Sequence, residues 1–219
     1  MKLLAIDACT QTCSVSLYNS GVKVSRFIKD VKKSSGLILP LCSEVFDEAG
    51  LVLADVDGII YTKGPGAFTG VRMCVGVVQG LSLAFNTPTL GFSTLEVLAY
   101  GGMKKYNSKN IAVAIDARMG EVYWGFYKKN KLQNESLKKP NEVDTLGEDF
   151  IGVGTGWGAY EQELSKKSGI TTFYANFHPK ADNLIDLALV SLKNGKILKN
   201  ELPLPTYLRN NVAKKSSKQ

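Results

Sequence analysis

The chain carries one sequence pattern twice, about half its length apart. Residues 3–21 read LLAIDACTQTCSVSLYNSG, and residues 111–130 read IAVAIDARMGEVYWGFYKKN. The aspartates of the two copies, Asp7 and Asp116, lie 109 positions apart (116 − 7) in a chain of 219 residues. In both copies a short polar turn follows the aspartate, and apolar residues then alternate with polar ones, as in a half-buried strand. Each half is therefore predicted to open with a β-hairpin.

Each half then continues with a strand, a glycine-rich loop and a helix. The two segments are GIIYTKGPGAFTG at residues 58–70 and FIGVGTGWGAYEQEL at residues 150–164. Capping residues and apolar spacing predict helices at about residues 35–49, 69–85, 93–102, 157–168 and 182–194. We expect an α/β chain with an N-terminal lobe at residues 1–105 and a C-terminal lobe at residues 106–219 that ends in a basic tail. The two lobes, with mixed sheets and flanking helices, resemble the duplicated fold of the actin, hexokinase and Hsp70 superfamily.

The paired aspartates are candidate remnants of phosphate-binding hairpins. Two carboxylates that end facing strands can hold a hydrated Mg²⁺ under a nucleotide phosphate, but each can equally cap its own hairpin turn. Active kinases of the superfamily place a glycine two residues beyond the aspartate, where this chain has Cys9 and Arg118. Both hairpins therefore resemble degenerate phosphate loops, with candidate residues Asp7, Thr10, Asp116 and Arg118.

The glycine loop YTKGPGAFTGVRM, residues 61–73, resembles a phosphate loop only in outline. The spacing of the P-loop fails because no lysine follows either glycine at the required place, and the dinucleotide pattern fails because its third glycine falls one position late. We therefore expect the loop to serve as the entry to a buried helix, with Thr69 as the N-cap. Its candidate residues are Gly64, Gly66, Thr69 and Gly70.

Composition narrows the class of protein. No apolar run reaches the length of a membrane span, and Asp7 interrupts the N-terminus before a signal peptide could form, so we expect a cytoplasmic protein without a membrane contact.

Four cysteines and one histidine predict reduced thiols and no metal site. The net charge of +7 is consistent with contact to RNA, although much of it is scattered or lies in the tail AKKSSKQ, and no aromatic residues are interleaved with a basic patch.

Two helices carry more apolar surface than one lobe needs. The apolar residues of the first predicted helix cover an arc of roughly 200°, and the second is apolar on nearly all sides, with a stripe of small residues at Gly76, Gly80 and Ala84. We predict that these helices contact a partner subunit. The predicted interface residues are Leu37, Leu41, Cys42, Val45, Arg72, Val75, Gly76, Gln79, Gly80 and Leu83.

Three sets of residues resemble a narrower family. The segments are LAIDACTQTCSVSL, GPGAFTGVRMCVGVVQGLSLA, and AIDARMGEVYW together with GTGW and YLRNNVA. They are similar to the TsaB (YeaZ) family, which takes part in the synthesis of threonylcarbamoyladenosine in tRNA.

The resemblance implies a non-catalytic scaffold or activating subunit, required for threonylcarbamoylation of the adenosine beside the anticodon of tRNAs that read ANN codons. Its partners would be a TsaD-like transferase, a TsaE-like ATPase and tRNA within the complex, with a homodimer when the chain is isolated. It would need no cofactor of its own, because ATP, Mg²⁺ and the transfer metal would lie on the partner subunits.

Three other functions are open. Asp7 and Asp116 could belong to an active ATP-dependent phosphotransferase. A peptidase would need a nucleophile such as Ser14, Ser34 or Cys42, none of which has an assignable base. An RNA-binding module is favoured by the tail charge and disfavoured by the lack of aromatic platforms.

Overall fold

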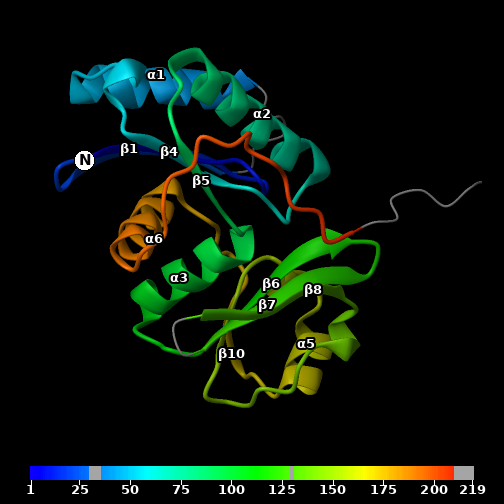
Figure 1. Cartoon of the computed structure of the whole chain (residues 1–219). Coiled ribbons are helices and arrows are strands. Elements are labelled where there is room, and N and C mark those ends of the chain that lie inside the picture. Colours follow the sequence, from blue (N-terminus) through cyan, green and yellow to red (C-terminus); the bar gives the residue numbers. More distant parts are fainter. Residues whose placement is uncertain (30–35, 129–130, 210–219) are drawn as a thin grey trace, which may run out of the picture.

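Two five-stranded sheets form the framework of the protein. A computed structural model describes residues 1–29, 36–128 and 131–209 (Figure 1). The first sheet has the order β3-β2-β1-β4-β5 and the second the order β10-β9-β6-β7-β8. Their strands are β1 (Lys2–Asp7), β2 (Cys13–Asn19), β3 (Val22–Ile28), β4 (Gly58–Thr62), β5 (Thr89–Phe92), β6 (Ile111–Arg118), β7 (Glu121–Lys128), β8 (Lys131–Lys138), β9 (Ile151–Val153) and β10 (Thr172–Tyr174).

The two sheets have one topology, as the repeated pattern predicts. In each sheet the first three strands pair as antiparallel neighbours, and the fourth and fifth strands extend the sheet in parallel from the first. Ile6 pairs with Val15 in the first hairpin, and Ile115 pairs with Tyr123 in the second. The predicted hairpins and the duplicated α/β fold class are confirmed.

The helices lie close to their predicted positions. They are α1 (Ile38–Ala49), α2 (Phe68–Phe85), α3 (Thr94–Tyr106), α4 (Gly156–Ala159), α5 (Glu161–Ser168) and α6 (Ala181–Lys193), with short 3₁₀ turns at Leu53–Asp55 and Pro140–Glu142. The predicted start of the first helix, Ser35, lies outside the described residues. The helix predicted at 157–168 divides at Tyr160, whose φ of −137° is not helical. Thr69 is not the N-cap of α2, because the helix begins one residue earlier and Ala67 occupies the cap position.

Two helices pack on the sheet that belongs to the other half of the chain. Helices α1 and α2 cover one face of the first sheet, whereas α6 covers its other face. Helix α3 packs on the second sheet, whose far face is covered by α4 and α5. The strands of the two sheets fall on either side of residue 105, but α3 and α6 lie between the sheets (Figure 1).

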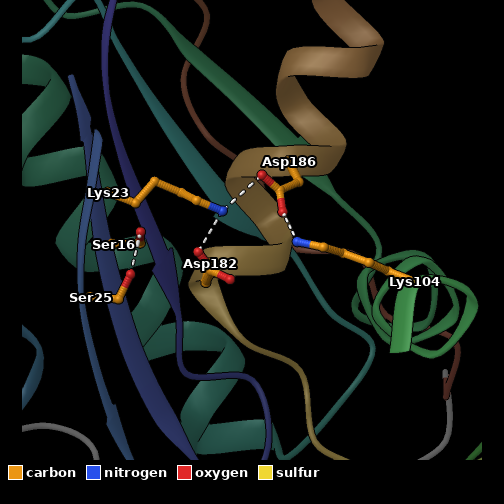
Figure 2. A network of polar contacts seen from close by, with 6 residues as sticks. All are labelled: Ser16, Lys23, Ser25, Lys104, Asp182 and Asp186. Carbon is orange, nitrogen blue, oxygen red and sulfur yellow. Dashed lines mark hydrogen bonds and ion pairs between the residues drawn. The ribbon is translucent and has the colours of Figure 1, made fainter. Parts of the chain in front are cut away.

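A charged network fastens these two inner helices to the first sheet (Figure 2). Lys23 on β3 lies 2.6 Å from Asp182 and 2.8 Å from Asp186, both on α6. Lys104 on α3 reaches the other oxygen of Asp186 at 2.6 Å. Burial of the Asp186 carboxylate opposes ionisation, but the hydrogen bonds from Lys104 and Lys23 outweigh it and lower the pKa of Asp186. The network therefore joins β3, α6 and α3.

Helix α2 combines a buried face with an apolar open face. Among the described residues it is the one helix with the length and apolar composition to cross a membrane. Its buried side chains, which include Val71, Cys74, Val75 and Val78, belong to the core under the first sheet. Composition of this kind also occurs in the core helices of soluble proteins.

Candidate functional site

The first hairpin keeps its aspartate inside the lobe. Asp7 ends β1 and is fully buried, and the Thr62 hydroxyl donates a hydrogen bond of 2.6 Å to its Oδ1. Burial raises the pKa of the Asp7 carboxyl to about 6, against the lowering effect of hydrogen bonds from Thr62 and from the Cys9 backbone. Its Oδ2 has no hydrogen-bond partner among the described residues. Asp7 thus caps its own turn and does not line the space between the lobes.

The glycine loop packs directly onto this first hairpin turn. A Cβ added at Gly66 would lie 1.9 Å from the Cys9 carbonyl oxygen, and one at Gly70 would lie 2.4 Å from the Ala8 oxygen. The Ala67 N–H donates to the same Cys9 oxygen at 2.8 Å. The loop backbone therefore fills the space beside the hairpin turn that a bound phosphate would need.

The other two members of the predicted glycine loop differ in their surroundings. Gly64 has a φ of +100°, and a Cβ there would lie 2.6 Å from the Thr206 oxygen. Thr69 is exposed in the first turn of α2. Gly64 therefore permits a close backbone contact with Thr206, whereas Thr69 has no capping role.

The second hairpin holds its aspartate nearer to solvent. The backbone N–H of Arg118 donates to Asp116 Oδ1 at 2.8 Å, so Asp116 also caps its own turn. Tyr160 donates to the same oxygen at 3.3 Å, and the Asp116 N–H donates to Thr155 at 3.1 Å. Arg118 and Met119 adopt left-handed backbone conformations, with φ of +63° and +58°. Their side chains are 71% and 74% exposed at the tip of the hairpin.

A cavity of about 570 Å³ lies between these loops. Of the predicted phosphate-loop residues, Thr10, Asp116 and Arg118 line it, and of the four candidate residues of the glycine loop, Gly66 lines it. The other lining residues are Gln11, Pro65, Ala67, Phe68, Val71, Arg72, Ile115, Ala117, Tyr123, Thr155, Thr206, Tyr207, Leu208 and Arg209.

The segment at residues 199–209 forms one wall of the cavity. It leaves the first lobe, where Lys199 pairs with Thr89 on β5 and Pro203 accepts a hydrogen bond of 2.7 Å from Gln79 on α2. It reaches the second lobe at Arg209, which lies 2.6 Å from Glu121. In Figure 1 this is the orange-to-red segment that passes α2 toward the second sheet. The basic tail predicted after it lies outside the described residues.

An aromatic and cationic stack stands at the first-lobe side of the cavity. The Arg72 guanidinium lies 3.4 Å from the centroid of the Phe68 ring and 5.7 Å from that of Tyr207. Its Nε–H donates to the Tyr207 hydroxyl at 3.1 Å. Phe68 is 49% exposed and Tyr207 43% exposed. The expectation that aromatic platforms are lacking is therefore wrong, because the fold unites residues that are 139 positions apart (207 − 68).

The predicted partner face divides into exposed and buried residues. Arg72, Gly76, Gly80 and Leu83 are exposed on α2, and a Cβ at Gly76 or Gly80 would meet nothing within 4 Å among the described residues. Leu37 and Gln79 are half-buried.

Four predicted interface residues do not face outward. Leu41, Cys42, Val45 and Val75 are buried in the first core, so their assignment to a partner surface is wrong. The reason is that α1 packs against β2, β3 and α2 together, which covers its wide apolar arc within the chain. Leu39 is the large apolar side chain that α1 exposes instead.

The thiol and hydroxyl groups considered as nucleophiles are enclosed. Burial raises the pKa of the Cys42 thiol to about 12, and Ser14 is buried with its hydroxyl accepting a hydrogen bond from the Ala181 N–H. Ser34 lies outside the described residues. Within the described part of the chain, no group of three or more His, Cys, Asp or Glu side chains is placed to hold a metal ion.

In sequence, the chain resembles known proteins that are named for the synthesis of threonylcarbamoyladenosine in tRNA. Residues 30–217 match the family model described as tRNA N6-adenosine threonylcarbamoyltransferase, TsaD. The tRNA threonylcarbamoyladenosine biosynthesis protein TsaB of Escherichia coli is 37% identical over 97% of this chain and 96% of its own. The protein of the same name from Haemophilus influenzae is 32% identical over 97% and 95%.

A solved structure agrees with these sequence relatives. YeaZ from Pseudomonas aeruginosa superposes with a TM-score of 0.86 at 36% identity, covering 94% of this chain and 99% of that one. A second Pseudomonas aeruginosa structure, described as an uncharacterized protein with similarity to peptidase YEAZ, superposes with a TM-score of 0.87 at 37% identity, covering 95% and 99%.

Proposed function

The chain belongs to the TsaB (YeaZ) family of tRNA threonylcarbamoyladenosine biosynthesis proteins, and from this premise we propose that it is a non-catalytic subunit of the modifying machinery. In this role it supports a TsaD-like transferase and a TsaE-like ATPase in the cytoplasm. The modified residue is the adenosine beside the anticodon of tRNAs that read ANN codons. ATP, Mg²⁺ and the transfer metal are held by the partner subunits.

One observation carries the non-catalytic assignment: the backbone of Gly66 rests against the Cys9 carbonyl. An active phosphate hairpin needs open space and free backbone N–H groups beside its turn. Here the Ala67 N–H is used by Cys9, and Asp7 is buried beneath the turn. A nucleotide phosphate would have to displace protein backbone to reach that carboxylate.

The open face of α2 supports a partner surface. Gly76, Gly80 and Ala84 follow one another at four-residue spacing on the exposed side of the helix, and the neighbouring Leu83 is 86% exposed. Small residues at this spacing let a second helix approach closely, and exposed apolar side chains beside them add buried area on contact. We assign this face to the transferase subunit, and to a second copy of the chain in the purified protein.

The phosphotransferase alternative has one structural point in its favour, since a cavity persists between the lobes with Asp116 and Thr10 on its wall. A calorimetric titration with Mg-ATP separates the two assignments. Tight, saturable binding together with turnover that Asp7→Ala abolishes would replace the non-catalytic assignment. A peptidase has no comparable support, because Cys42 and Ser14 are both buried.

The assignment is tested by removing the gene and measuring nucleosides from total tRNA by mass spectrometry. We expect threonylcarbamoyladenosine to be lost, and to return when the chain is supplied again. In a reconstituted reaction, the transferase and the ATPase should need this chain for turnover, while the chain alone should give no product. Normal modification in its absence would contradict the proposal.

A further inference from the structure

We propose that the cavity between the lobes binds one unpaired nucleotide of an RNA strand, with its base against the stack of Phe68, Arg72 and Tyr207 and its phosphate beside Arg118. The proposal rests on the function in tRNA modification proposed above, and adds a binding site to it. The cavity volume of about 570 Å³ lies within the range of roughly 300–1,000 Å³ that is usual for small-ligand sites.

The base-binding part is the stack on the first lobe. Unpaired RNA bases bind proteins mainly by stacking on aromatic rings and on guanidinium planes. Phe68 and Tyr207 supply two half-exposed rings whose centroids are 6.4 Å apart, and the Arg72 guanidinium lies over the Phe68 ring, so that the plane of the guanidinium continues the stack. No carboxylate of the described residues forms an ion pair with Arg72, so its charge is available to an anionic ligand.

The phosphate-binding part is the tip of the second hairpin. Arg118 holds a left-handed backbone conformation that non-glycine residues adopt rarely and that concentrates at functional sites. Two hydrogen bonds to the Arg118 backbone stabilise this conformation. The Asp116 carboxylate accepts one from the Arg118 N–H, and Arg209 donates the other to the Arg118 carbonyl at 3.2 Å. The Arg118 guanidinium meets Asp116 at 3.2 Å through one nitrogen, and its remaining N–H groups can bind a phosphate oxygen.

The same geometry favours an RNA phosphodiester over a free nucleoside triphosphate. A triphosphate carries several charges and needs a cradle of backbone N–H groups or a metal ion. The glycine loop offers no such cradle at the first hairpin, because Gly66 and Ala67 are packed on Cys9. A phosphodiester carries a single charge, which one exposed guanidinium suits. The net charge of +7 adds a general attraction for the rest of the strand.

The test is fluorescence anisotropy of the full chain with a short, labelled, single-stranded oligoadenylate, using Phe68→Ala, Arg118→Gln and the control Arg26→Gln. Arg26 is a half-exposed arginine on β3 that pairs with Glu44 and Glu48, so its substitution removes the same charge away from the cavity. Circular dichroism checks that every variant folds.

Phe68→Ala should weaken binding between about fivefold and a hundredfold, as expected for the loss of one stacked base. Arg118→Gln should reduce the slope of log affinity against log salt by about one, which the loss of a phosphate contact predicts and a purely structural change does not. Arg26→Gln should leave the affinity within about twofold, because exposed charges far from the strand are screened.

The proposal is overturned if the unchanged chain shows no measurable binding, or if all three variants lose affinity equally. If AMP displaces the labelled RNA at the affinity of the oligonucleotide, the site takes free mononucleotides and the RNA strand is the wrong ligand. Each of these binding results can be obtained whether or not the chain takes part in tRNA modification, so failure of the site and failure of the proposed function are distinguishable. A chain that restores tRNA modification while its cavity variants bind RNA normally would refute the site alone.

Discussion

The backbone of Gly66 touches the carbonyl of Cys9 so closely that a Cβ at residue 66 would lie 1.9 Å from the oxygen. This contact fixes the glycine loop on the first hairpin and directs the chain into α2. A glycine-rich sequence that resembles a phosphate loop thus serves here to join two parts of the protein.

Gly66→Ala is therefore expected to destabilise the fold. The nearest atoms to the new methyl group belong to the Cys9 backbone, so the loop or the hairpin must shift, at a cost of about 1–3 kcal/mol or more. Urea denaturation measures the loss. The matched control is Gly76→Ala, where a Cβ meets nothing within 4 Å among the described residues and the helix should gain roughly 0.5–1 kcal/mol. Equal effects of the two substitutions would contradict the contact.

Asp7→Asn should make the free energy of unfolding less dependent on pH. The folded pKa of about 6 exceeds the unfolded value of 3.8, so the folded chain binds this proton more tightly than the unfolded chain does. Well below pH 3.8 the carboxyl is protonated in both states and imposes no penalty. As the pH rises from 4 to 6 stability falls, and above pH 6 the whole penalty, about 3 kcal/mol, is present.

The measurement is urea denaturation of the unchanged chain and Asp7→Asn between pH 4 and pH 8. The variant should be the more stable protein at pH 7.5, and its advantage should shrink toward pH 4. An asparagine keeps the acceptor that Thr62 uses, so this hydrogen bond is preserved. A stability difference that stays constant across the range would show that ionisation of Asp7 is not responsible.

Asp186→Asn should weaken the attachment of α6 and α3 to the first sheet. Asp186 accepts hydrogen bonds from both Lys23 and Lys104, and its pKa is lowered, so its contribution is present at neutral pH and lost as the pH falls through the folded pKa. We expect a loss of about 1–3 kcal/mol at pH 7, measured by thermal or urea unfolding. Glu48→Gln is the control, because solvent screens its surface pair with Arg26, so its loss should change the stability less than Asp186→Asn does.

The repeated pattern was enough to predict the two hairpins and the equal topology of the lobes, because strand alternation and the aspartate turn are local features. The third strand of each sheet, β3 and β8, was not identified in the sequence. Both are sheet edges with mostly half-exposed or exposed side chains, so neither shows a strong apolar alternation. Edge strands depend on their neighbours for hydrogen bonds more than on their own composition.

The cavity wall could not be predicted for a different reason. Residues 199–209 have no periodic pattern, and their position is set by contacts with distant residues such as Gln79 and Glu121. The prediction assigned too many residues of α1 to the partner face. The width of an apolar arc shows how much of a helix surface is covered, but it does not show whether the chain itself or a partner covers it. The sheet and α2 bury Leu41, whereas Leu39, two residues earlier, is exposed.

This difference gives a matched pair of substitutions on α1. Leu41→Glu places a charge in the core and should unfold the chain or lower its stability by several kcal/mol. Leu39→Glu should leave the melting temperature nearly unchanged, because that side chain is 56% exposed. A pull-down with the transferase subunit then tests whether Leu39 belongs to the partner face, without the complication of misfolding. Equal melting temperatures for the two variants would contradict the burial of Leu41.

The open face of α2 allows the sharpest test of the partner surface. Gly80→Arg adds a long charged side chain to the exposed stripe where a Cβ meets no described atom, so the isolated fold should survive. If the stripe is the desolvated centre of the interface, the substitution costs roughly 2–5 kcal/mol of binding free energy and lowers association with the transferase subunit by about two orders of magnitude. Thermal melting and partner pull-down are measured together, with Lys166→Glu on the exposed side of α5 as a surface control. An unfolded Gly80→Arg variant would show that the stripe belongs to the core, and unchanged melting with unchanged pull-down would place the partner on another face.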